Sequence, residues 1–532
     1  MTNSRKGLSM LPLARAAAKS ARPDVTSDKH RTKICRDVLF AKPPTGQLAE
    51  FAVALSRLPV DERHYWTGTF YTLLLDPKLR KEQATYFTPP ELAEIIIDMA
   101  VEAGFDIAAD DVLDPAAGGA AFLSTLAGRV RQAGIDPEAA SYRLNGLEID
   151  RGLAALSRIL IADRLGAKPR RGMIVSADAL RTRIPASYDL VIANPPYGRM
   201  SESCASDLPW RSVCHPGHIN KYALFVELCL RHAKPGGIVA LVIPSSFRAG
   251  PLFATLRKHI RSESQVLAIG TVGQRNRLFV DVAQDVSVLI LRKGEAHKVD
   301  LPVTFHEIGS TVITRRDGLL PRDATAPWSL PNSEEELHGG HTLSDWGAEA
   351  RSGYFVWNRQ LDRLVCEPGE NYSVPLIWAK NVRPGHLCRP SGKNGRRMDF
   401  VTFEGNSRAI IRRPAVILQR TTNEKQPRRL LAATVDPRIV SKWGGFTTEN
   451  HTIALTTNSQ REAELLCQLL NTDEVDRRYR KVSGTAAISV ALLRGLDLPS
   501  PARFSAALSI CSGDADAAAR AAYAETAVVA DA

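Results

Sequence analysis

Short apolar runs alternate with longer stretches of helical periodicity in the first half of the chain. Four runs have the length of a strand and lie at residues 111–113, 144–150, 173–175 and 188–193. Strands that alternate with helices favour a parallel sheet with helices on its faces. We therefore predict an α/β fold in which the residues that follow each strand gather at one edge of the sheet.

The rest of the chain has less periodic order, with a predicted buried strand at 415–418. A chain of 532 residues is too long for one hydrophobic core, so we expect two or more domains. The segments are predicted to be 1–75, 76–296, 297–345, 346–500 and 501–532. In this order they are a basic arm with a helical extension, the α/β domain, a connecting region, a carboxy-terminal domain and an alanine-rich tail.

Acidic residues end the first three strands of the predicted sheet. Asp114 opens a tight turn of small residues, 114–123, where the backbone can approach a nucleotide closely. Glu148 is placed to accept hydrogen bonds from ribose hydroxyls, as in dinucleotide folds. Asp178 follows the third strand, where its carboxylate could accept from an adenine amine. The three acids predict a site for an adenosyl ligand.

The fourth strand runs into Asn194-Pro195-Pro196-Tyr197. A loop of this kind at the end of a strand suits the methylation of a planar amino nitrogen, such as that of adenine. This amine is a poor nucleophile, because its lone pair is delocalised into the ring. The Asn194 side-chain oxygen and the Pro195 carbonyl could accept its two N–H bonds, and the paired prolines fix the backbone that aims them. Tyr197 offers a ring face for a base. The alternative is an ordinary Pro-Pro turn with a packed tyrosine.

Together these motifs resemble the adenine-N6 DNA methyltransferases that use S-adenosylmethionine, specifically the TaqI-like group. The resemblance runs from about residue 86 to about residue 499. It implies a Rossmann-like S-adenosylmethionine-dependent methyltransferase sheet, followed by a mixed α+β domain that recognises DNA. S-adenosylmethionine is the implied cofactor, and double-stranded DNA is the implied partner.

The resemblance also assigns roles to single residues. The turn 114–123 matches the family's Asp-Pro-Ala-Cys-Gly-Ser-Gly-Ala-Phe-Leu pattern except at Ala117, Gly119 and Ala120, so its second glycine is missing. Phe279 takes the place of the aromatic residue that packs on the far side of a flipped adenine, although a core phenylalanine is the alternative. The implied cofactor contacts are Thr88, Asp114, Ala116, Gly118, Phe122, Glu148 and Asp178. The implied catalytic residues are Asn194, Pro195, Pro196, Tyr197 and Phe279.

Positive charge is concentrated in two parts of the chain, whose net charge is +12. Residues 376–430 hold 13 Lys or Arg and 3 Asp or Glu, and residues 1–40 hold 9 and 3. Cationic surface of this kind suits contact with phosphates, although a charged face can also be merely solvated. The residues that could read bases or bind phosphates are Arg396, Arg397, Arg420, Asn423, Lys425, Arg428 and Arg429.

Other features exclude several classes of protein. No apolar stretch approaches the roughly 20 residues of a membrane helix. The eight cysteines lie singly, without a Cys-x-x-Cys pair, so neither a metal site nor a disulfide framework is indicated, and a cytoplasmic location is expected. The first two dozen residues imitate a transit peptide, but we predict a disordered basic arm.

The predicted function is site-specific transfer of a methyl group from S-adenosylmethionine to N6 of a flipped adenine in duplex DNA. Such a monomeric enzyme would protect host DNA from a separately encoded restriction endonuclease. Methylation of RNA or of a protein glutamine is one alternative, because an amide presents the same electronic problem. The catalytic subunit of a multi-subunit restriction system and a non-catalytic DNA-binding subunit are two others.

Overall fold

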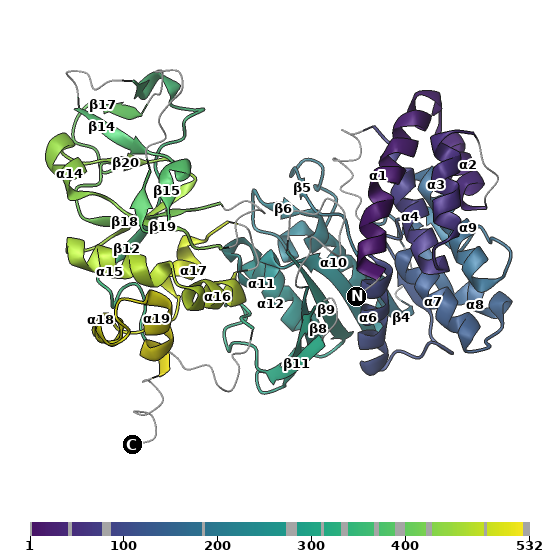
Figure 1. Cartoon of the computed structure of the whole chain (residues 1–532). Coiled ribbons are helices and arrows are strands. Elements are labelled where there is room, and N and C mark those ends of the chain that lie inside the picture. The colour runs from purple at the N-terminus through teal and green to yellow at the C-terminus, as the bar shows by residue number, and fades with distance from the viewer. Residues whose placement is uncertain are drawn as a thin grey trace. The chain divides into compact units, whose positions relative to one another are not determined.

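The computed structural model describes residues 3–40, 45–76, 87–183, 187–272, 285–309, 313–330, 339–366, 372–388, 399–421, 428–483 and 487–524. Its contacts divide the chain into two compact units (Figure 1). Unit 1 comprises Met1–Phe247 and Leu252–Pro327, and unit 2 comprises Arg248–Pro251 and Trp328–Ala532. Each unit has its own sheets, so each is described by itself.

A nine-stranded sheet in the order β11-β10-β8-β9-β7-β4-β1-β2-β3 forms the centre of unit 1. Strand β1 pairs in parallel with β2 and β4, and β2 pairs in parallel with β3. Their bounds are Val112–Asp114 for β1, Leu144–Glu148 for β2, Ile174–Ser176 for β3 and Tyr188–Ala193 for β4. These strands lie within two residues of the apolar runs, so the predicted α/β fold is confirmed.

The other strands complete the sheet on its opposite side. Strand β7 runs parallel to β4, whereas β9 is antiparallel to both β7 and β8. Strand β10 then pairs in parallel with β8, and β11 pairs antiparallel with β10. The bounds are Ala233–Pro244 for β7, Ser264–Val272 for β8, Val286–Lys293 for β9, Val303–Ile308 for β10 and Ile313–Gly318 for β11.

The sheet therefore continues past residue 296, into the segment that we expected to be a connecting region. Strand β10 buries Val303, Phe305 and Ile308, whereas Glu307 is exposed. This near-alternation of buried and exposed positions is the pattern of a strand with one covered face.

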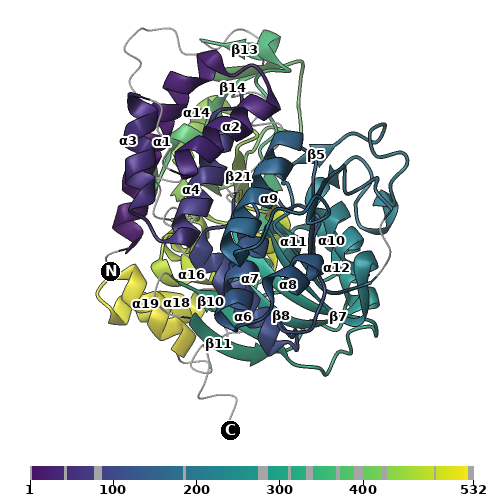
Figure 2. The same cartoon turned by 90° about the vertical axis from the view of Figure 1, so that its right-hand side faces the viewer.

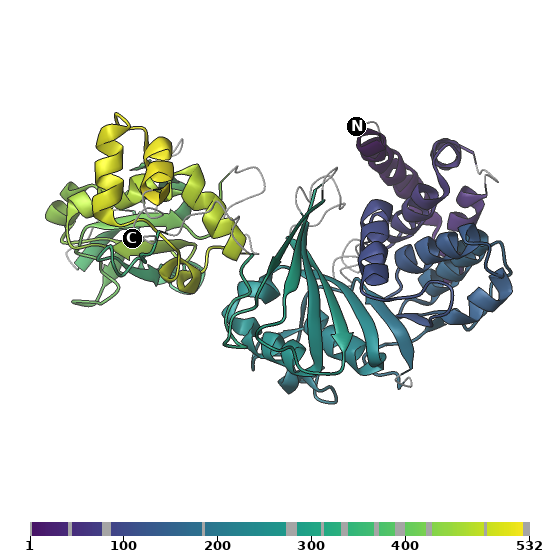
Figure 3. The same ribbon diagram turned by 90° about the horizontal axis from the view of Figure 1, so that it is seen from below.

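Two groups of helices cover the sheet. Helix α7 contacts both α6 and α9. Helix α10 contacts α12 and the strands β4 and β7. Figure 3 shows the two groups on opposite faces of the twisted sheet. Their bounds are Pro90–Glu102 for α6, Ala121–Gln132 for α7, Arg151–Leu165 for α9, Lys221–His232 for α10 and Ala254–Glu263 for α12.

The prediction of a disordered basic arm is wrong, because the amino-terminal residues fold into helices. They are α1 Asn3–Ala21, α2 Asp28–Leu39, α3 Gln47–Ser56 and α4 Val60–Leu73. The buried side of α1 is made by Met10, Ala14, Ala17, Ala18 and Ala21. This spacing of three and four residues forms one apolar stripe of a helix. The stripe joins a core that includes Leu153, Leu156 and Leu160 of α9. Figure 2 shows the ribbons of α1 to α4 and of α9.

Among its described residues, unit 2 contains two four-stranded sheets. The first has the order β12-β21-β18-β19, in which β12 is Glu349–Ser352, β21 is Thr452–Thr456 and β19 is Ala432–Thr434. The second has the order β13-β17-β14-β20, with bounds Leu364–Val365, Phe400–Phe403, Tyr372–Ile377 and Thr447–Thr448. Strand β18 is Ala415–Gln419, in agreement with the predicted buried strand. Helices α15 Gln460–Leu470, α18 Pro501–Ile510 and α19 Ala515–Ala524 share a hydrophobic core with the first sheet. The described part of the alanine-rich tail is thus part of a mixed α+β unit, which confirms the predicted class of this domain.

Within the described ranges, none of the helices combines the length and the apolar character needed to cross a membrane.

Candidate active site

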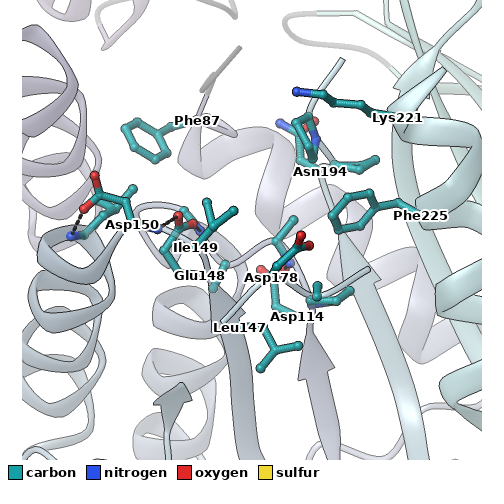
Figure 4. A pocket seen from close by; sticks show the side chains of 18 of the residues that line it. Phe87, Asp114, Leu147, Glu148, Ile149, Asp150, Asp178, Asn194, Lys221 and Phe225 are labelled. Carbon is teal, nitrogen blue, oxygen red and sulfur yellow. Dashed lines mark hydrogen bonds between the residues drawn. The ribbon is translucent and has the colours of Figure 1, made fainter. Parts of the chain in front are cut away.

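A cavity of about 570 Å³ opens at the carboxyl ends of the central strands of unit 1. Its lining includes residues 115–118 after β1, 148–151 after β2, 177–180 after β3 and 194–197 after β4. Parallel strands end at the same edge of a sheet, so the turns that follow them meet there. Figure 4 shows side chains from these turns around the shared space. The structure thus brings the predicted motifs together.

The turn after β1 owes its shape to small residues. Asp114 is buried, and its Oδ1 accepts a hydrogen bond from the Ala116 N–H at 3.0 Å. Ala120 has a φ of 59°, in the left-handed region that favours glycine. Alanine therefore keeps the backbone conformation at the position where the family pattern has its second glycine. A Cβ atom on Gly118 or Gly119 would lie 3.0 Å from the Phe87 ring, so only a small residue fits there.

Backbone hydrogen bonds hold the Glu148 carboxylate against this turn. Glu148 Oε2 accepts from the Gly118 N–H at 2.9 Å, and Oε1 accepts from the Asp150 N–H at 2.8 Å. Burial raises the pKa of Glu148 to about 7, although both of these hydrogen bonds favour its charged form. Burial also raises the pKa of Asp114 to about 8, with a further contribution from the Glu148 charge. The cavity therefore has carboxyl groups that titrate near neutral pH.

Asp178 also lines the cavity, between Glu148 and Asn194 in Figure 4, and its side chain is partly exposed. Its Oδ1 accepts from the Leu180 N–H at 3.0 Å, and its Oδ2 lies 2.8 Å from Arg181 Nη1. Side chains this exposed form weak ion pairs, so Arg181 leaves Asp178 able to accept from a ligand.

Asn194, the first residue of the loop after β4, has hydrogen-bond partners on two sides of its amide. Asn194 Nδ2 donates to Thr88 Oγ1 at 3.2 Å, and the Tyr197 hydroxyl lies 3.0 Å from Asn194 Oδ1. The same hydroxyl lies 3.3 Å from the Val242 carbonyl oxygen. The Tyr197 ring is 9% exposed and meets the Tyr222 ring edge to face, with centroids 6.5 Å apart. Thr88 therefore contacts the asparagine, and most of the Tyr197 ring is packed.

Several cavity residues were not predicted from the sequence. Ile149 follows Glu148 and is 64% exposed, and Phe225 and Lys221 come from the first part of α10. Tyr71 comes from α4, in the segment that we expected to be an extension outside the catalytic domain. Side chains of these types usually serve a core or a surface, so only the position of Ile149 next to an acidic strand end was a signal. Phe279 lies outside the described residues, as do Arg396, Arg397, Asn423 and Lys425.

Comparison with known proteins finds a family whose members this part of the chain resembles. Residues 67–316 match the family described as N-6 DNA Methylase. The Type II methyltransferase M.PstI of Providencia stuartii is 25% identical over 338 residues, which are 59% of this chain and 65% of that protein. M.BsuBI of Bacillus subtilis is 24% identical over 359 residues, which are 62% of this chain and 68% of that protein. The matched region thus spans a little less than two thirds of M.PstI.

Solved structures with a related arrangement include the Type IIL restriction-modification enzyme MmeI in complex with DNA. That match has a TM-score of 0.49 and 12% identity, and it covers 97% of this chain and 90% of the other. A class I S-adenosylmethionine-dependent methyltransferase from Listeria monocytogenes matches with a TM-score of 0.40 and 17% identity. It covers 57% of this chain and 93% of the other.

Proposed function

We propose, from the membership of residues 67–316 in the N-6 DNA Methylase family, that this chain methylates N6 of adenine in DNA. The observation that carries the proposal is the meeting of two predicted motifs in one cavity. The Asn194-Pro195-Pro196-Tyr197 loop suits an amine acceptor, and the Asp114 turn with Glu148 suits an adenosyl donor. A methyltransferase needs the methyl donor and the acceptor amine within reach of each other.

The residues at the strand ends fit S-adenosylmethionine as the donor. The cavity volume of about 570 Å³ lies within the range of roughly 300–1,000 Å³ that is typical of small-molecule sites. Glu148 would accept from the ribose hydroxyls and Asp178 from the adenine amine, while the backbone of residues 115–118 approaches the ligand closely. When bound, this cofactor supplies an electrophilic methyl group on a sulfonium.

Asn194 and Pro195 would prepare the target amine. Thr88 accepts from Asn194 Nδ2, and this bond orients the amide so that Oδ1 is its acceptor atom. A carbonyl oxygen has two lone pairs, so Oδ1 can accept from both the Tyr197 hydroxyl and the adenine amine. With the Pro195 carbonyl on the second N–H, the nitrogen lone pair becomes available for in-line attack. The amine proton is released to water afterwards, so no strong general base is needed.

Unit 2 is the proposed target-recognition domain, because much of the basic segment 376–430 lies in it. One described arginine of this segment has a structural role. Arg428 pairs with Asp473, the first residue of α16 (Asp473–Val482), and lies 3.9 Å from Asp516, which makes it unsuitable for reading bases. The matched relatives are Type II methyltransferases, so we propose a monomer that works beside a separately encoded endonuclease.

The test is to identify the methylated product. The purified chain is incubated with genomic DNA and S-adenosylmethionine that carries a labelled methyl group, and the DNA is hydrolysed to nucleosides. We expect label in N6-methyl-2′-deoxyadenosine, and sequencing of an unhydrolysed sample should place the methylated adenine in one short sequence. Label only in RNA or in glutamine of added protein would contradict the DNA proposal, and the absence of any cofactor binding would contradict the enzymatic one.

A further inference from the structure

The amino-terminal helices provide one wall of the candidate active site. Tyr71 and Thr72 of α4, Leu75 after it and Asp28 of α2 all line the cavity. Both α2 and α4 contact α9, the helix that begins just after Glu148. Nothing in the sequence motifs of the site depends on these helices. Their place in the wall therefore calls for a separate explanation.

Tyr71 is the centre of a hydrogen-bond chain that ends at Glu148. Its side chain is fully buried, and its hydroxyl donates to Asp150 Oδ1 at 2.7 Å. The same oxygen accepts from the Leu153 N–H at 2.8 Å, which makes Asp150 the N-cap of α9. The Asp150 backbone N–H in turn donates to Glu148 Oε1. One phenol thus fixes the turn that presents the predicted ribose-binding carboxylate.

The fit between the amino-terminal helices and α9 is close at this point. Thr32 Oγ1 of α2 donates to the Gly152 carbonyl oxygen at 2.9 Å. A Cβ atom on Gly152 would lie 2.1 Å from the Tyr71 hydroxyl oxygen, so only glycine leaves room for the phenol. Arg31 Nε lies 3.4 Å from the same hydroxyl, on the α2 side. Three elements are therefore arranged around one hydroxyl group.

We propose that Tyr71 is a positioning residue for the methyl donor and that the amino-terminal helices complete the donor pocket. The inference rests on the proposed function, because it takes S-adenosylmethionine as the ligand of the cavity. The phenol acts through Asp150 and the 148–150 turn, and through Oε1 it holds the Glu148 carboxylate in the orientation that would meet the ribose hydroxyls. Loss of the hydroxyl frees this turn but leaves the amine-binding loop, which starts at Asn194, in place.

The experiment uses the full chain with Tyr71→Phe, which removes one oxygen and keeps the buried ring. We measure the Kd for S-adenosylmethionine by calorimetry, the KM and kcat for methyl transfer, and the Tm. We expect Kd and KM to rise about tenfold, with kcat at saturating cofactor within a factor of about two. The matched control is Tyr142→Phe, since Tyr142 is 58% exposed and its ring stacks with Arg170 away from the cavity. It should leave all of these quantities unchanged.

An unchanged Kd in Tyr71→Phe would overturn the inference. So would a lower Tm and kcat with unchanged KM, because that result indicates packing alone. If Tyr71→Phe does not fold, Thr32→Val removes the bond between α2 and α9 and should raise KM about threefold, and an unchanged KM there would equally overturn it. Failure of the wild-type chain to bind S-adenosylmethionine would instead contradict the proposed function itself, so the two failures are distinguishable.

Discussion

The Asn194 side chain is hydrogen-bonded to the hydroxyl groups of Thr88 and Tyr197, and substitutions at Asn194 and Thr88 test its role. Asn194→Ala deletes the acceptor and should lower kcat by on the order of a hundredfold or more, with cofactor affinity retained. Thr88→Val removes the hydroxyl that accepts from Nδ2 and so weakens the orientation of the amide, and we expect kcat to fall about tenfold. Thr88→Ser keeps the hydroxyl and is the control. Near-normal turnover of Asn194→Ala in a methyl-transfer assay would exclude its catalytic role.

The proposed role of Glu148 in binding S-adenosylmethionine predicts a pH dependence of that binding. Burial raises the pKa of its carboxyl to about 7, so the group is largely neutral below pH 7 and charged above it. Only the carboxylate can accept from both ribose hydroxyls. The affinity for S-adenosylmethionine should therefore increase as pH rises from 6 to 8. Calorimetric titration across this range measures it, and Glu148→Gln should bind more weakly and lose most of that increase. A pH profile shared by both proteins would assign the titration to another group.

Ala120 offers a test of the departure from the family pattern. A left-handed backbone costs a residue with a Cβ roughly 1–2 kcal/mol, and this is partly offset by the greater freedom of glycine in the unfolded chain. Ala120→Gly should therefore raise the free energy of unfolding of unit 1 by about 0.5–1 kcal/mol, measured in urea. Ala139→Gly in the α8 helix Pro137–Arg143 is the control and should destabilise by a similar amount. A destabilised Ala120→Gly would mean that the methyl group packs favourably.

At the scale of residues, the sequence predicts the polar residues of the cavity better than the apolar and aromatic ones. Glu148 and Asn194 stand out because polar side chains directly after buried strands have few structural uses there. Ile149, Phe225 and Tyr71 could not be found in this way, because apolar and aromatic side chains are the ordinary material of a core. Their role depends on which helix faces the cavity, which is a property of tertiary packing.

At the scale of elements, strands with strong apolar runs were predicted, and elements with a mixed pattern were not. Strands β1 to β4 lie where the pattern placed them, whereas β10 was missed although its sequence nearly alternates. Helix α1 was missed because its charged residues suggested an arm, while its alanine stripe was the better signal. Charge indicates which face is solvated and says little about whether a segment folds.

One buried histidine of α4 makes polar contacts with two helices of unit 1. His64 Nδ1 lies 2.8 Å from Ser124 Oγ of α7, and His64 Nε2 lies 3.0 Å from Asp163 Oδ2 of α9. His64→Leu leaves both partners without this bond, so it should lower the free energy of unfolding by about 1–3 kcal/mol. His451→Leu, at a side chain that is 57% exposed, is the control. Equal thermal stability of both variants would show that α4 is held by apolar packing alone.

The His64 contact also lowers the pKa of Asp163. A carboxyl whose folded pKa is depressed stabilises the fold above its unfolded pKa, and this contribution is lost as pH falls through the folded value. The difference in stability between the wild-type chain and His64→Leu should therefore shrink in acid.

At the scale of the whole molecule, the division into two units predicts which function survives truncation. Residues 1–327 hold the complete cavity, and most of unit 2 lies beyond them. A chain that ends at residue 327 should bind S-adenosylmethionine with nearly unchanged Kd and lose sequence-specific methylation. A chain that starts at residue 76 should lose cofactor binding, since it lacks Tyr71 and the helices around it. The methylated sites are mapped by sequencing. If the chain that ends at residue 327 methylated the same sites as the full chain, recognition would lie in unit 1.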